Sequence, residues 1–301
     1  MNKQEMKLKS DCIPCLVERT KYECDILFED DKEKILVLRD FIAFLFEHLE
    51  GELNAPVFFG TERERILKRR SGAEDPHELV KRRSNKVAKG LLLEAYTFYN
   101  AARDKLEALI RIAAAANSME YGVKGYSYSD EIFRRDFLRT LNEKLNWDRS
   151  VILAAINSRE RLIYLTDNAG EVFFDVFVIR ELIKMGKEVI VSPKSAPVIN
   201  DATIEDLKEA GISSSEAGCK IIPSGAYIGV SLEEAEGEFM DVFSDDRYLV
   251  IAKGMGNYES ISEFESKLDL NGRLIYLFRA KCEPIADDIG VRRGELVAKF
   301  A

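Results

Sequence analysis

Residues 162–171, LIYLTDNAGE, decide the fold, because a short apolar run ends there in a polar loop that contains glycine. Similar runs of β-branched and aromatic residues recur at 188–191, 220–222, 248–252 and 274–278. Helical stretches are predicted between them, near 172–185, 203–210 and 232–239. Strands that are apolar on both faces and alternate with helices are typical of a parallel sheet covered by helices. The sequence therefore predicts a Rossmann-like α/β/α domain with a parallel-rich sheet over residues 151–301.

The N-terminal half has a different periodicity. Up to about Trp147, apolar residues recur at helical spacing, as Phe41 and Leu45 do, and no sustained strand alternation is present. We therefore expect an α-helical N-terminal lobe over residues 1–150.

Composition restricts the classes of partner. The 301-residue chain carries a net charge of −9, which argues against general affinity for nucleic acid. Its apolar runs are too short to cross a bilayer, and its first residues lack the apolar core of a secretory signal. We expect a cytoplasmic protein that binds neither nucleic acid nor membrane, and the sequence makes no prediction of its oligomeric state. Its single glutamine beside abundant Lys, Glu and Arg is typical of a thermophile.

One basic segment, residues 67–89, departs from this acidic average. A solvated helical face interleaved with acids is the favoured interpretation, and an electropositive rim that attracts an anionic substrate is the alternative.

The five cysteines include a C-x-x-C formed by Cys12 and Cys15. No second C-x-x-C or pair of histidines completes a four-ligand zinc site, and the motif opens a helical segment instead of following a strand. Buried thiols are the favoured interpretation, and a redox or accessory-metal role stays open.

Polar residues follow the predicted strands, where ligands bind in a doubly wound sheet. Asp167, Asn168 and, further on, Asp201 offer the hard oxygen ligands that suit magnesium or manganese. Gly170 lets the backbone approach an anion at the next helix N-terminus, and Lys253 could place its ammonium on a phosphate oxygen. We therefore predict a cation and phosphate site whose catalytic residues are Asp167, Asn168, Asp201 and Lys253.

The same loops supply candidate substrate-binding residues, namely Glu171, Ser224, Gly225, Lys253 and Asn257. Taken singly, Asp201 also fits a helix N-cap, and the glycines that follow Lys253 also fit a turn. No P-loop motif is present, the G-x-G after Lys253 is a weak dinucleotide fingerprint, and the two histidines lie outside these loops.

Three motifs resemble those of one known family. They are TDNAGE at 166–171, PVINDAT at 197–203 and KGMGNYE at 253–259, and together they are similar to the signature of the damage-control phosphatases. The resemblance extends to DCIPC at 11–15 and to KC at 281–282, so it covers nearly the whole chain.

The resemblance implies one divalent metal, with Asp167, Asn168 and Asp201 as ligands, and phosphate contacts from Lys253 and Asn257. It also implies that Asn117 and Glu120 line the pocket from the helical lobe, although AANSME at 115–120 departs from the family's A-G-N-x-x-D. Family members hydrolyse small phosphorylated metabolites, including sugar phosphates and damaged phosphate esters, and usually prefer manganese, cobalt or nickel over magnesium.

The sequence thus predicts a metal-dependent phosphomonoester hydrolase that acts on a small phosphorylated metabolite. The first alternative is a nucleotide- or phosphometabolite-binding protein without turnover. A module that binds RNA or a protein through residues 67–89 is less favoured, because that segment lacks interleaved aromatic residues.

Overall fold

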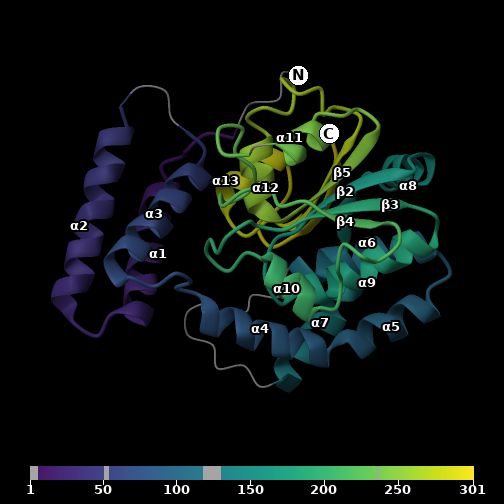
Figure 1. Ribbon diagram of the computed structural model, residues 1–301, viewed down its shortest axis with the longest axis horizontal. Coiled ribbons are helices and arrows are strands. Elements are labelled where there is room, and N and C mark those ends of the chain that lie inside the picture. Colours follow the sequence, from purple (N-terminus) through teal and green to yellow (C-terminus); the bar gives the residue numbers. More distant parts are fainter. Residues whose placement is uncertain (1–5, 51–53, 118–129, 236) are drawn as a thin grey trace.

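The computed structural model describes residues 6–50, 54–117, 130–235 and 237–301. A sheet of seven strands carries helices on both faces, and three N-terminal helices form a bundle beside it (Figure 1). The strands are β1 (Leu145–Trp147), β2 (Arg161–Leu165), β3 (Glu188–Ser192), β4 (Cys219–Ile221), β5 (Tyr248–Lys253), β6 (Leu274–Arg279) and β7 (Leu296–Phe300). The helices are α1 (Cys12–Leu27), α2 (Asp31–His48), α3 (Pro56–Ser71), α4 (Glu78–Gly90), α5 (Leu92–Ala101), α6 (Lys105–Asn117), α7 (Asp130–Leu141), α8 (Arg149–Ser158), α9 (Glu171–Lys184), α10 (Ile204–Glu209), α11 (Glu238–Phe243), α12 (Gly254–Ile261) and α13 (Glu283–Ile289). The predicted α/β class and parallel-rich sheet are confirmed.

The strand order is β1-β7-β6-β5-β2-β3-β4, and it determines where two neighbouring strands are followed by loops that run in opposite directions. Strands β2 to β6 run parallel, whereas β7 is antiparallel to β6 and β1 runs with β7. The chain adds β3 and β4 on one side of β2, then returns to add β5 and β6 on the other. The winding therefore reverses between β2 and β5, and a crevice is expected beyond the carboxyl ends of these two strands.

Helices cover both faces of the sheet (Figure 1). On one face α6 and α9 pack against the strands, with α4, α5 and α7 outside them. On the other face α11, α12 and α13 share a second core with the strands. The bundle of α1, α2 and α3 has its own core, which includes Phe41 and Phe59.

The residues before 150 do not all belong to that bundle. Helix α6 packs against α9 and β6, and β1 pairs with β7. Strand β1 lies in the stretch predicted to be helical. The sequence did not reveal this strand because three residues are too few to show a strand period. The division of the chain into domains at residue 150 stays a prediction.

One predicted helix is displaced. The stretch 232–239 was expected to be helical, but α11 begins at Glu238. Gly237 precedes it at φ 58°, a left-handed conformation that a helix interior does not contain. Among the described helices, none is long and apolar enough to cross a bilayer.

The basic segment 67–89 runs from the end of α3 into α4, and three of its eight Lys and Arg side chains form ion pairs in the described part of the chain, namely Arg70, Lys81 and Arg82. Lys81 is buried, with its ammonium 3.2 Å from Asp75 and 3.1 Å from Asp206. Arg82 is exposed and pairs with Glu78 along α4. The interpretation as a solvated face therefore suits Arg82, but it is wrong for Lys81, which burial has turned into an internal counter-ion.

Candidate active site

The site lies where β2 ends, at the reversal of the winding. A single antiparallel bridge pairs Asn168 with Asp201. The Ala202 N–H donates to the Asp167 carbonyl at 2.7 Å, and the Ala169 N–H donates to the Asn200 carbonyl at 2.9 Å. The structure therefore brings together the loop after β2 and the segment around Asp201, as expected for two loops at one sheet edge.

Side chains from three elements meet at Asp167. Its Oδ2 accepts hydrogen bonds from the amides of Asn117 and Asn168, each at 2.7 Å. The Asn168 amide also donates to Glu171 at 3.0 Å, and the Asn117 amide lies 3.1 Å from the same carboxylate. Among the described residues, no hydrogen bond is made to Oδ1 of Asp167. One oxygen of this carboxylate is thus fixed by amides, and the other remains available to a ligand.

Lys253, at the end of β5, is fully buried and engaged by two acids. Its ammonium lies 2.6 Å from Oε1 of Glu171 and 2.6 Å from Oδ1 of Asp175. Both acids raise the pKa of Lys253 further than burial lowers it. Tyr164 donates to the same oxygen of Asp175 at 2.6 Å. Lys253 therefore acts in this structure as the internal counter-ion of Glu171 and Asp175.

Lys253→Met is expected to lower the free energy of unfolding by roughly 3–5 kcal/mol, because it leaves two buried carboxyl groups without their cation. Lys220→Met is the matched control, since Lys220 is 56% exposed and pairs with Glu238 at the surface. That exposed pair should contribute at most about 1 kcal/mol. Denaturant unfolding of both variants tests this, and equal losses would show that Lys253 is not an essential counter-ion.

Asp201 is buried, and the charges of Lys194 and, to a smaller extent, Lys81 act on it. The Lys194 ammonium is 3.9 Å from Oδ2 of Asp201 and donates to the Gly229 carbonyl. Burial raises the pKa of Asp201 well above its usual range, and the nearby charges of Asp167 and Glu171 add to this rise. At 3.9 Å, Lys194 is too far for a hydrogen bond, so the carboxylate lacks close compensation.

The charges fit a divalent cation. Asp167 is partly exposed, whereas Glu171, Asp175 and Asp201 are buried. In the described part of the chain, the buried ammonium groups of Lys194 and Lys253 lie beside these acids, and the charge of buried Lys81 also acts on Asp201. Burial raises the pKa of Asp167 to about 7, and the neighbouring Glu171 raises it next. Burial also raises the pKa of Asp175 to about 6. Burial and neighbouring negative charges disfavour the ionised form of these carboxyl groups, and a bound cation would stabilise it. Carboxylate and amide oxygens are also the ligands that a hard divalent cation prefers.

A model of the damage-control phosphatase ARMT1-like domain matches residues 8–297. The chain belongs to this family. It is 31% identical over 296 residues to a damage-control phosphatase of Archaeoglobus fulgidus, covering 98% of this chain and 99% of that protein. It is 33% identical over 301 residues to an uncharacterized protein of Methanocaldococcus jannaschii, covering 98% and 95%. A crystal structure of a DUF89 family protein from Pyrococcus horikoshii is similar with a TM-score of 0.84 and 27% identity, over 97% of this chain and 98% of that one.

Two glycines of the family motifs allow close approach at the site. Gly254 has φ 82°, and a Cβ there would lie 2.1 Å from Oδ2 of Asp167. Gly170 has φ 76°, and a Cβ there would lie 2.9 Å from the Cβ of Ser84. The Gly170 N–H donates to Oδ1 of Asn85 at 2.6 Å, so the predicted anion-binding amide already has a partner.

Three other residues that were predicted to bind substrate form hydrogen bonds with the protein's own backbone. Asn257 is buried, and its amide donates to the carbonyls of Lys253 at 2.7 Å and Thr166 at 3.3 Å. Ser224 and Gly225 bond to the backbone of the loop after β3, through Pro193 and Ser195, so they support that loop. Glu120 lies outside the described residues.

Sequence reasoning assigned no role in the site to three residues that the structure places there. Asn85, on α4, joins Gly170 to Asp206 and Glu209. Lys194 faces Asp201, and the charge of Lys281 lowers the pKa of Asp167. The positions of Lys194 and Lys281, in the loops after β3 and β6, are the signal that would have identified them.

A second group of metal-ligating side chains lies inside the helical bundle. Glu23, Glu64 and His77 are buried, with ligand atoms within 4.8 Å of one another. Arg63 and Arg19 already bind the Glu23 carboxylate, each with one contact of 2.8 Å, and His77 lies 3.3 Å from Glu64. The arginines supply the positive charge that a metal would bring, so we interpret this group as a buried ion-pair network that joins α1, α3 and the start of α4.

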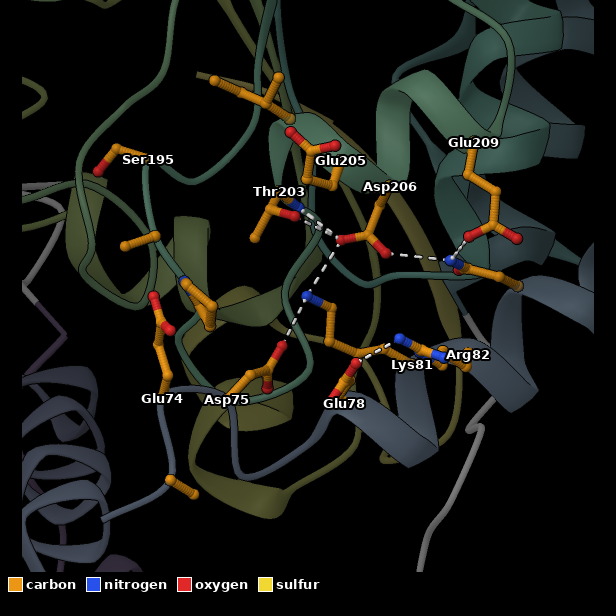
Figure 2. A pocket seen from close by; sticks show the side chains of 15 residues that line it. Glu74, Asp75, Glu78, Lys81, Arg82, Ser195, Thr203, Glu205, Asp206 and Glu209 are labelled. Carbon is orange, nitrogen blue, oxygen red and sulfur yellow. Dashed lines mark hydrogen bonds and ion pairs between the residues drawn. The ribbon is translucent and has the colours of Figure 1, made fainter.

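A cavity of about 1030 Å³ opens beside the site between α4 and α10 (Figure 2). Asn85 and Thr203 are among its lining residues. Lys81 bridges Asp75 and Asp206 (Figure 2). Six carboxyl side chains but only two cationic ones line it: Glu74, Asp75, Glu78, Glu205, Asp206 and Glu209 against Lys81 and Arg82. An excess of acids repels a phosphate, so we do not assign the phosphate to this cavity.

Proposed function

We propose that the protein hydrolyses phosphomonoesters of small metabolites with the help of one divalent cation held by Asp167, Asn168 and Asp201. The observation that carries this is the set of poorly compensated carboxyl groups at the reversal of the winding between β2 and β5, in a chain that belongs to the damage-control phosphatase family. When bound, the cation would polarise a phosphoryl oxygen and lower the pKa of a water. Manganese, cobalt or nickel is the expected choice over magnesium.

The protein's own groups would position the reactants. The amides of Asn117 and Asn168 hold one oxygen of Asp167, which leaves the other, or a carboxylate oxygen of Asp201, to orient the attacking water and accept its proton. Lys253 holds the carboxyl groups of Glu171 and Asp175 in place. Lys281, whose charge acts on Asp167, is a candidate to contact the phosphate. A direct phosphate contact by Lys253 or Asn257 stays a prediction that requires them to leave their present partners.

Release of inorganic phosphate from sugar phosphates and p-nitrophenyl phosphate tests the proposal. The metal-stripped protein should be inactive, and added manganese, cobalt or nickel should restore turnover more strongly than magnesium. Saturable binding of the phosphate esters without turnover under any metal would favour the non-catalytic binding protein instead.

Cation affinity should rise with pH between about 5 and 8, because the ligands must be deprotonated to bind. Burial raises the pKa of Asp167 to about 7 and raises that of Asp201 well above its usual range, so in the metal-free protein both carboxyl groups hold their protons more strongly than ordinary aspartates do. Each proton released per cation gives about a tenfold rise in affinity per pH unit. Calorimetric titration with manganese checks this, and an affinity that does not change with pH would contradict it.

A further inference from the structure

Three cysteines from opposite ends of the chain line one cavity whose lining does not include Asp167 or Asp201. The cavity, of about 630 Å³, lies between α1, α3, α12 and α13. Its wall includes Cys12 and Cys15 from the start of α1, Cys282 just before α13, and the Glu259 side chain of α12. No cysteine among the described residues forms a disulfide. The C-x-x-C motif, which the proposed phosphatase activity does not use, thus meets a third thiol and a carboxylate.

The four groups share the lining of this cavity, and their charges act on one another. Burial raises the pKa of Cys282 to about 11, and the charges of Glu259, Cys12 and Cys15 raise it as well. The pKa of Cys12 is raised by burial, and also by Glu259 and Cys15. Thiols with raised pKa values are poor nucleophiles, which argues against a redox-active pair.

Glu259 has no hydrogen bond or ion pair from its carboxylate among the described residues. Burial raises its pKa to about 8, and the nearby Glu263 raises it further. Arg63 and Arg293 also line the cavity, but Arg63 pairs with Glu23 and Arg293 donates to the Lys281 carbonyl. Lys281 lines the same cavity as well, but no ion pair described in the structure joins it, or either arginine, to the partly buried Glu259 carboxylate.

We propose that Cys12, Cys15, Cys282 and Glu259 form a second cation site, which takes a thiophilic divalent ion such as Zn²⁺. Three sulfur ligands and one carboxylate oxygen match the tetrahedral preference of zinc. The site at Asp167 offers only carboxylate and amide oxygens, which suit a harder ion. As each sulfur–metal bond forms, the thiol loses its proton to solvent and no electron is transferred. The ion would fasten α1 to the segment that carries Lys281.

The four ligand atoms must converge for this. In the described part of the chain they do not form a group within 4.8 Å, so the side chains must rotate toward the cavity centre. Cys15 is exposed and Cys282 is partly exposed, which leaves room for that rotation.

Cobalt absorption tests the site without reference to catalysis. Metal-stripped full-length protein titrated with Co²⁺ should develop the near-ultraviolet absorption of thiolate-to-cobalt charge transfer, which oxygen ligands at Asp167 do not produce. Cys15→Ser and Cys282→Ser should each lower the affinity more than the roughly 10–100-fold that loss of an outer-shell partner costs. Cys219→Ser is the matched control, because Cys219 is a buried thiol on β4, outside the cavity.

A second measurement guards against variants that fail to fold. In the wild-type protein, Zn²⁺ should protect Cys15 and Cys282 together from alkylation, as read by peptide mass mapping. Absence of the charge-transfer absorption, equal absorption in the Cys282→Ser variant, or alkylation unchanged by Zn²⁺ would overturn the proposal. Because none of these readouts depends on phosphate release, the site can fail while the phosphatase proposal stands, and the reverse.

Discussion

Asp167→Asn is expected to reduce metal-dependent phosphate release by about a thousandfold, since a cation contributes several kcal/mol of transition-state stabilisation and each 1.4 kcal/mol is a factor of ten. The substitution keeps the size of the side chain while it removes the charge that would hold the cation. Steady-state kinetics with manganese and p-nitrophenyl phosphate measure the effect. Asp241→Asn, at an exposed position on α11, is the control and should retain wild-type turnover.

A measurement of stability distinguishes the loss of turnover in Asp167→Asn from a loss of the folded structure. The folded-state pKa of Asp167 is about 7, raised from its ordinary value of 3.8, so the folded protein binds more protons than the unfolded chain between these values. The metal-free wild-type protein should therefore lose stability as pH rises from about 4 to 7, and Asp167→Asn should lose less. Thermal unfolding in chelator at both ends of this window checks the sign. Wild-type turnover in a folded Asp167→Asn variant would refute the site assignment.

Gly254→Ala is expected to reduce turnover by at least about a hundredfold, although the residue contributes no side chain to the site. A Cβ at this position would lie 2.1 Å from Cγ and Oδ2 of Asp167 and 2.3 Å from Oδ1, so the carboxylate must move. Displacement of a reacting group by about 1 Å is enough for such a loss. The same kinetic assay, with manganese affinity measured in parallel, should show both quantities weakened.

Gly272→Ala is the matched control for backbone strain. Gly272 has φ 80°, almost the same as Gly254, and a Cβ there would meet nothing within 4 Å. Both variants incur the left-handed penalty of roughly 1–2 kcal/mol, but only Gly254→Ala displaces Asp167. Equal activity of the two variants would show that the position of Asp167 does not depend on the space that Gly254 leaves.

Much of the fold could be predicted from local patterns. The runs around β2, β3 and β5 are apolar at successive positions because both faces of the sheet are buried, and this separates them from the helical periodicity of α6. Strand β1 escaped prediction because it is short, and the onset of α11 depends on the backbone conformation of Gly237.

The candidate site was only partly visible in the sequence. Asp167, Asn168 and Asp201 could be selected because each follows a predicted strand and carries an oxygen ligand. The role of Lys253 could not, since it depends on Glu171 and Asp175, which belong to another strand–helix unit and turn the lysine into a buried counter-ion.

The sequence by itself determined the parallel sheet, the loops that carry the polar residues, and the three family motifs, because these depend on neighbours along the chain. Only the tertiary structure decided that β5 lies beside β2, that Asn117 reaches Asp167 across 50 residues, and that Cys282 shares a cavity with the C-x-x-C of α1. Strand order and burial follow from packing between distant segments. Packing also determines which charged groups are paired and which still lack a partner.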